Sequence, residues 1–197
     1  MDSEYGAAAW SGEPGVARIK PIDMEQVQGA PREALEQVVS AHGRATNMKR
    51  TLARSPVALR SLMTWYDLRD EVVTFLGSRA TVLFAHAIST GTDCLVCSTF
   101  FRRALAEAGD DPDDLRLDER EALVVEFGRQ LARDPHGVSD ELFGRLSGMF
   151  VEDQIVSLTA FGGLMVATNL FNNALQVDLD EYLWAHRRGE GRRAADE

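Results

Sequence analysis

The stretch SRATVLFAHAISTGTDCLVCSTFFRRALAEAG, residues 78–109, contains both cysteines of the chain, Cys94 and Cys97. Apolar residues on either side of a polar turn predict two consecutive helices, the second of which opens on the cysteines. Asp93 is a candidate N-cap, which would place both cysteines in the first helical turn. There, unpaired backbone N–H groups and the helix dipole stabilise a thiolate, and a spacing of three residues puts both sulfurs on one face. The motif predicts a redox-active dithiol, although two such cysteines can also be small buried hydrophobic residues.

The composition is typical of a soluble globular protein. The 197 residues are 45% hydrophobic and 26% charged, which is enough for one substantial core. A formal net charge of -10 without a basic stripe argues against nucleic acid as a partner. The N-terminus lacks a charged-then-apolar leader pattern, so we expect a cytoplasmic protein, in which a lone CxxC is more often catalytic or metal-binding than structural. No second CxxC or histidine pair could complete a zinc site, and no flavin, haem or nicotinamide motif is present. We therefore expect no metal and no cofactor.

Helical spacing of apolar residues dominates the rest of the chain, and no convincing run alternates, so we expect an all-α fold. An extended or partly disordered arm is predicted for residues 1–28, one helical domain for 29–188 and a disordered tail for 189–197. Helix-start signals predict further helices at about residues 31–40, 47–53, 57–73, 118–132, 139–146 and 179–186.

Residues 154–177 form the most apolar stretch and include no charged residue. Their length would suit a membrane span, but two glycines and four amide side chains interrupt the second half. A helix buried on nearly every side, at the centre of the fold or of an oligomer, fits better, and we expect no membrane partner. The amides of Asn169, Asn172 and Asn173 are expected to bond neighbouring backbone or to link subunits, rather than to catalyse.

Several phrases together resemble the carboxymuconolactone decarboxylase/alkylhydroperoxidase D-like (AhpD-like) superfamily. They are residues 47–56, Cys94-Leu-Val-Cys97, and residues 117–121, 134–141 and 169–175, and the match covers roughly residues 30–184. The resemblance implies an AhpD-like antiparallel helical bundle that assembles as a homotrimer or homohexamer. Members with a CxxC pair act as thiol-dependent peroxidases, so the resemblance also implies an antioxidant oxidoreductase.

The chain departs from the peroxidase motif of this superfamily at two positions. The motif places a glutamate twelve residues before the first cysteine and a histidine four residues after the second, where this chain has Val82 and Phe101. His86 follows Val82 by one helical turn, and histidine titrates near neutral pH. We therefore predict that His86 is the proton relay, although a lone histidine in apolar company is also a common core residue.

Two lines of reasoning assign different roles to the two thiols. The resemblance implies that Cys97 attacks the peroxide and that Cys94 resolves the sulfenic acid. The helix dipole alone instead favours Cys94 as the thiol of lower pKa. Apolar residues around the motif, among them Phe100 and Phe101, predict an organic hydroperoxide as the substrate. A thioredoxin- or lipoyl-type reductant protein would then regenerate the dithiol.

Two other functions are compatible with the sequence. A carboxymuconolactone-decarboxylase-like or specialised-metabolism enzyme would act on a hydrophobic small molecule with a base and would not need the cysteines. A non-catalytic, redox-sensing helical oligomer would need no substrate. Failure to turn over alkyl hydroperoxides with a dithiol reductant would favour the former, and thiols inert to alkylation would favour the latter.

Overall fold

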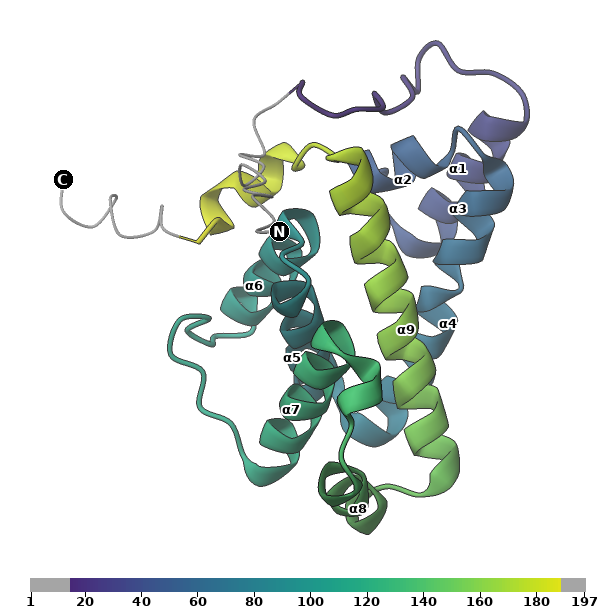
Figure 1. Cartoon of the computed structure of the whole chain (residues 1–197). Helices are drawn as coiled ribbons and strands as arrows, with labels where there is room; N and C mark the ends of the chain where they lie inside the picture. The colour runs from purple at the N-terminus through teal and green to yellow at the C-terminus, as the bar shows by residue number, and fades with distance from the viewer. Residues whose placement is uncertain (1–14, 189–197) are drawn as a thin grey trace, which may run out of the picture.

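The computed structural model describes residues 15–188, and within this range every regular element is a helix (Figure 1). The predicted all-α class is therefore confirmed for this part of the chain. The elements in order are α1 (Ala30–His42), α2 (Asn47–Leu52), α3 (Pro56–Met63), α4 (Trp65–Leu76), α5 (Ser78–Gly91), α6 (Leu95–Glu107), α7 (Glu119–Arg133), η1 (Pro135–Gly137), α8 (Asp140–Met149), α9 (Glu152–Leu175) and η2 (Glu181–His186). Residues 1–14 of the predicted arm and the predicted tail, 189–197, lie outside the described residues.

Residues 15–28 of the predicted arm contain no helix; residues 15–18 lie against the C-terminal end of α9 and the segment after it, and Ile22 exchanges hydrogen bonds with Arg50 of α2. The backbone N–H of Arg18 donates to the carbonyl of Leu175 at 2.9 Å. The N–H of Ala17 donates to the carboxylate of Asp178 at 3.1 Å. This part of the arm is thus anchored to its own chain.

Helix α5 lies at the centre of the fold and packs against α6, α7 and α9 (Figure 1). Its buried side chains include Phe84 and Ile88, both fully enclosed. Gly128 on α7 permits the close approach of α5, because a Cβ at this position would lie 3.1 Å from the carbonyl oxygen of Phe84 and 3.2 Å from the Ile88 side chain. Such dense packing leaves little freedom, so the end of α5 and the turn that follows it are held in place.

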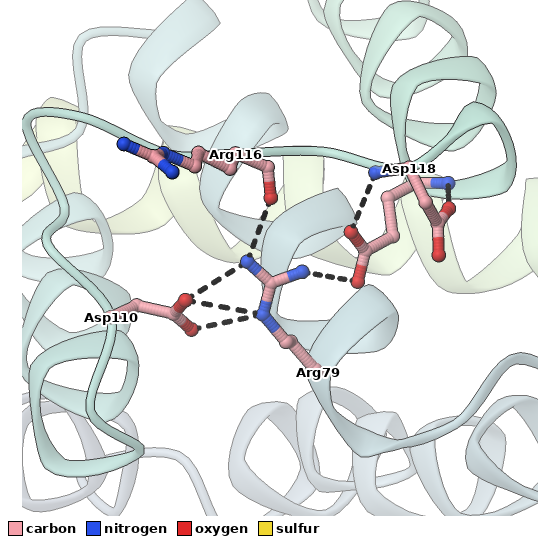
Figure 2. A network of polar contacts seen from close by, with 5 residues as sticks. Arg79, Asp110, Arg116 and Asp118 are labelled. Atoms are coloured by element: carbon pink, nitrogen blue, oxygen red, sulfur yellow. Dashed lines mark hydrogen bonds and ion pairs between the residues drawn. The ribbon is translucent and has the colours of Figure 1, made fainter.

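Arg79, in the first turn of α5, bonds the loop between α6 and α7 and the first turn of α7 (Figure 2). Its guanidinium pairs with Asp110 at 2.9 Å and with Glu121, and it donates to the carbonyl of Arg116 at 3.1 Å. Hydrogen bonding to Arg79 lowers the pKa of the Asp110 carboxyl. Glu121 also completes the predicted capping box of α7, since it accepts the backbone N–H of Asp118 at 3.1 Å and Asp118 accepts that of Glu121 at 2.8 Å. One arginine therefore joins the starts of α5 and α7 to the loop between α6 and α7.

Two predicted helices differ from those observed. The predicted helix 57–73 is divided at Thr64 into α3 and α4. The Thr64 hydroxyl donates to the carbonyl of Ser61 at 2.7 Å, a local bond that competes with a continuous helical ladder. The predicted helix 179–186 is the 3-10 helix η2, which begins without a side-chain cap and is short, as such helices usually are.

Helix α9 is buried on one side, whereas the sequence predicts burial on nearly every side. Leu158 and Phe161 are fully buried, but Val156 is 67% exposed and Leu170 is 66% exposed. By length and composition α9 could cross a membrane, and 44% of its most apolar window is buried inside the protein. Because apolar residues occupy both faces, the sequence pattern does not reveal which face meets the core.

Candidate functional site

The two cysteines lie where α5 turns into α6. Asp93 has a φ of +50°, a left-handed conformation, and the N–H of Cys94 donates to the carbonyl of Ser89 at 3.0 Å. Cys94 is therefore the N-cap of α6, so the prediction of Asp93 as the N-cap was wrong by one residue. Cys97 lies in the first turn, as predicted. Neither thiol forms a disulfide, and the exposed fraction is 0% for Cys94 and 7% for Cys97.

The two sulfurs influence each other's ionisation. The Cys97 thiol donates a hydrogen bond to the Cys94 sulfur, and this bond is the main cause that lowers the pKa of Cys94, against the opposing effect of burial. The backbone N–H of Cys97 and the amide of Asn172 lower it further. The same pairing, together with burial, raises the pKa of Cys97 well above its ordinary value. Cys94 therefore has the lower pKa of the two thiols, in agreement with the helix-dipole argument.

Asn172 of α9 supplies the polar contact to this pair. Its amide Nδ2 lies 3.2 Å from Cys97 Sγ, 3.9 Å from Cys94 Sγ and 3.5 Å from Met48 Sδ. The side chain is fully buried, and its Oδ1 has no hydrogen-bond partner among the described residues. An N–H donor pointing at sulfur stabilises a thiolate. Asn172 therefore contacts both cysteine sulfurs, a contact that the sequence prediction of a structural role did not anticipate.

The other two asparagines of α9 hold the turn that presents the cysteines. Asn173 Nδ2 donates to the carbonyl of Thr92 at 2.8 Å, as the predicted bond to neighbouring backbone requires. Asn169 Nδ2 donates to the Thr92 hydroxyl at 2.8 Å. Three buried or half-buried amides in the uncharged stretch 154–177 are thus a signal for a polar site, because each needs a partner from another segment.

A cavity of about 460 Å³ opens beside Cys97. Cys97 lines this cavity and Cys94 does not. Val82 and Phe101, which replace the glutamate and histidine of the peroxidase motif, both line it, so the wall near the thiol is apolar. Other apolar lining residues are Met48, Met63, Trp65, Val96, Phe100, Phe161 and Met165. The volume lies in the range of small-molecule sites, about 300–1,000 Å³.

His86 lies on α5 and is not among the residues that line this cavity. The charged groups that act on its imidazole are Arg102, Arg129, Arg188 and Asp113. Burial, followed by the three arginines, lowers the pKa of His86 from 6.5 to about 4. The imidazole is therefore neutral at pH 7 and is a weaker base than an ordinary histidine. The structure brings the two cysteines together with Asn172 and places His86 in different surroundings, so its relay role stays a prediction.

The lowered pKa of His86 makes the stability of the fold depend on pH. Between pH 6.5 and about 4 the unfolded chain binds a proton at this residue and the folded chain does not, so stability is lost as the pH falls through that window. We expect roughly 3 kcal/mol at most from this group, less any screening by solvent. His86→Gln should flatten this part of the decline, measured as the free energy of unfolding in urea at pH 7.5 and 4.5.

His136, which is exposed in η1, provides the matched control for that measurement. His136→Gln should keep the decline of the wild type. An equally steep decline in His86→Gln would show that other groups cause the acid sensitivity.

No protein-family model matches the sequence, and no curated protein does. Among solved structures, an uncharacterized peroxidase-related protein from Ralstonia eutropha, described as an alkylhydroperoxidase AhpD core, superposes with a TM-score of 0.67 at 14% identity and covers 86% of this chain and 95% of its own. An uncharacterized peroxidase-related protein from a Silicibacter species superposes with a TM-score of 0.64 at 15% identity, over 83% of this chain and 93% of its own. At such identities the likeness establishes the fold, and this chain has the AhpD-like fold.

Proposed function

We propose that this protein is a thiol-dependent peroxidase, a disulfide oxidoreductase that reduces organic hydroperoxides with Cys94 and Cys97. One observation carries the proposal: Cys97 lines a cavity whose wall near the thiol is apolar, while Cys94 is fully buried outside that cavity and has the lowered pKa. A nucleophile that meets the substrate and a second thiolate ready to resolve it are the two components that such chemistry needs. The peroxidase-related structures with the same fold support the proposal.

In the proposed reaction the pair begins as a thiolate on Cys94 and a thiol on Cys97. The Cys97 proton passes to Cys94 along their hydrogen bond, and the new Cys97 thiolate attacks the distal oxygen of the hydroperoxide. The O–O bond breaks, Cys97 becomes a sulfenic acid, and the departing alkoxide takes the proton from Cys94 to form the alcohol. The Cys94 thiolate then attacks the Cys97 sulfur, hydroxide leaves and is protonated by solvent, and a disulfide remains.

Cys94 performs here the proton transfer that the sequence analysis assigned to His86. The hydrogen bond within the dithiol and the apolar wall at Val82 and Phe101 support this route. The rate at which peroxide oxidises the thiols of His86→Gln distinguishes proton transfer by Cys94 from proton transfer by His86. A rate near that of the wild type agrees with a proton carried by Cys94, and a large loss would return the relay role to His86.

We propose that the disulfide is reduced by a lipoyl- or thioredoxin-type protein. Cys97 is 7% exposed and lies at a cavity wall, so a slender dithiol arm reaches it more readily than a flat protein surface does.

The resemblance also implies a homotrimer or homohexamer. The exposed apolar side chains Val156 and Leu170 on α9 support an assembly that covers this face.

The test is oxidation of the pre-reduced protein by one equivalent of cumene hydroperoxide, followed by mass spectrometry and thiol counting. We expect loss of both free thiols, loss of two hydrogen atoms in mass, and full recovery with dihydrolipoamide. Hydrogen peroxide should react more slowly, since the apolar wall contributes binding only to a substrate with an organic group. Thiols that stay reduced under these conditions would contradict the proposal.

The second candidate is a lactone-decarboxylase-like or specialised-metabolism enzyme, and one observation favours it. Lys49 and Asp180 both line the cavity. Burial lowers the pKa of the Lys49 ammonium and raises that of the Asp180 carboxyl, so each is closer to neutral than usual. A base of this kind acts on a substrate without the cysteines. Turnover that survives replacement of both cysteines would favour this function.

A further inference from the structure

The charges around the cavity are opposite in sign to those of the whole chain. The chain has a formal net charge of -10, yet four of the cavity's lining residues are cationic and one is anionic. The cations are Arg44, Lys49, Arg69 and Arg103, and the anion is Asp180. A cationic lining in an acidic protein attracts an anionic ligand to this cavity in particular.

Lys49 is the buried member of this group, with an exposed fraction of 3%. Its ammonium donates to the carbonyls of His42 at 3.4 Å and Arg44 at 3.2 Å, which leaves one N–H without a hydrogen-bond acceptor among the described residues. The pKa of Lys49 is lowered by burial, and the charge of Asp180 opposes this change only in part. The carboxylate of a ligand, in addition to that of Asp180, would accept the remaining N–H of the Lys49 ammonium.

Two arginines stand at the same side of the cavity. The guanidinium carbons of Arg44 and Arg103 lie 4.2 Å and 4.8 Å from the centre of the Tyr182 ring. A guanidinium stacked on a ring keeps its N–H donors in its own plane, where a carboxylate can bind two of them. Arg103 also pairs with Glu107 at 2.7 Å, and its side chain is 28% exposed. It is therefore held in place and still accessible from the cavity.

Much of the remaining lining is apolar. Phe161 and Met165 line the cavity together with Trp65, which lies 5.5 Å from Phe161 between ring centroids and has the guanidinium carbon of Arg69 5.5 Å from its own ring centre. The side chains of Phe161 and Met165 accept an aliphatic or aromatic body and offer no partner for a second charge. A ligand with a single acid group and an apolar body fits both the cationic and the apolar residues of the cavity lining.

We infer that the cavity binds amphipathic carboxylic acids, with the carboxylate beside Arg103 and Lys49 and the apolar body beside Phe161 and Met165. This inference rests on the proposed function for one further step: the peroxide substrate is then a hydroperoxide of such an acid. The acid holds the molecule by its charged end while the peroxide group on its body reaches Cys97.

The binding test uses decanoate and methyl decanoate, which share an apolar body and contain no peroxide. Isothermal titration calorimetry of the reduced, full-length protein should show decanoate binding at least about tenfold more tightly than the ester. Rising salt should weaken the binding of decanoate and leave that of the ester unchanged. Equal affinities for the two ligands would overturn the inference.

Adjacent arginines on α6 provide matched variants. Arg103 lines the cavity, whereas Arg102 does not and pairs with Asp113 at 2.9 Å. Arg103→Gln should weaken decanoate binding by about five- to tenfold and leave the ester unaffected, and Arg102→Gln should change neither. Lys49→Met should act like Arg103→Gln, with circular dichroism as the check that it folds. Decanoate binding unchanged in Arg103→Gln would overturn the inference.

Neither decanoate nor methyl decanoate contains a peroxide group, so the binding test is independent of the proposed peroxidase function. Selective decanoate binding in a protein whose thiols do not react with hydroperoxides would retain the acid site and reject the peroxidase. Thiols that react with hydroperoxides, together with equal affinity for acid and ester, would retain the peroxidase and reject the acid site.

Discussion

Cys97→Ser is expected to abolish peroxide turnover, with a fall in kcat/KM of about 10³-fold or more. Serine preserves the volume, but its hydroxyl is far less acidic than a thiol and does not act as the nucleophile with only Cys94 as a base. Cys94→Ser removes both the proton acceptor and the resolving thiol. Oxidation of Cys97 should then slow by about 10²-fold and stop at the sulfenic acid. Stopped-flow kinetics with cumene hydroperoxide and labelling by dimedone measure the two effects.

The same pair of variants decides which sulfur attacks. If Cys94 were the nucleophile, as its lowered pKa alone suggests, Cys94→Ser would be inactive and Cys97→Ser would collect the dimedone-reactive sulfenic acid. Ser98→Ala is the control, because among residues 15–188 the Ser98 hydroxyl donates to the carbonyl of Leu95 in the same helix, at 3.3 Å, and to no other residue. It should keep the rate of the wild type.

Asn172→Leu is expected to slow peroxide oxidation by about 10- to 100-fold and to change stability little. The variant removes the N–H that lies 3.2 Å from Cys97 Sγ, so the negative charge on either sulfur loses a donor and the pKa of Cys94 should rise. The Asn172 carbonyl oxygen is already without a partner among the described residues, so its loss leaves no new unsatisfied group. The rate of alkylation by iodoacetamide as a function of pH measures the thiolate directly.

Asn173→Leu is the matched control, from the next residue of the same helix. It deprives the carbonyl of Thr92 of a 2.8 Å hydrogen bond and should cost about 1 kcal/mol of stability. It should leave the pH dependence of alkylation near that of the wild type. If Asn172→Leu destabilised the protein and left the thiolate titration unchanged, Asn172 would be structural, as the sequence analysis expected.

Helix starts were predicted well because capping is a local interaction. Ser55, Asp118 and Ser139 each accept a backbone N–H from the first turn of the helix that follows, as the sequence indicates. The break at Thr64 was missed although its cause is local too. Apolar residues continue at helical spacing across it, and this pattern outweighed a threonine that can bond backwards.

His86 does not line the cavity, although Val82, one helical turn before it, does. Val82 and Ala85 line the cavity, and His86, one residue after Ala85, does not. Each residue of an α-helix turns by about 100°, so neighbours face different surroundings. The spacing from Val82 indicated a shared face but did not reveal where the cavity ends.

The chain alone was sufficient to predict the helices, the thiol pair at a helix start and the AhpD-like fold. The helices and the thiol pair depend on capping, spacing and apolar periodicity, which act over a few residues, whereas the AhpD-like fold was implied by the resemblance of several sequence phrases to that superfamily. The exposed face of α9, the bond from Asn172 to a cysteine 75 residues away, and the cations gathered around the cavity needed the folded chain. Each depends on how distant helices are rotated against one another, and side-chain packing across the core sets that rotation.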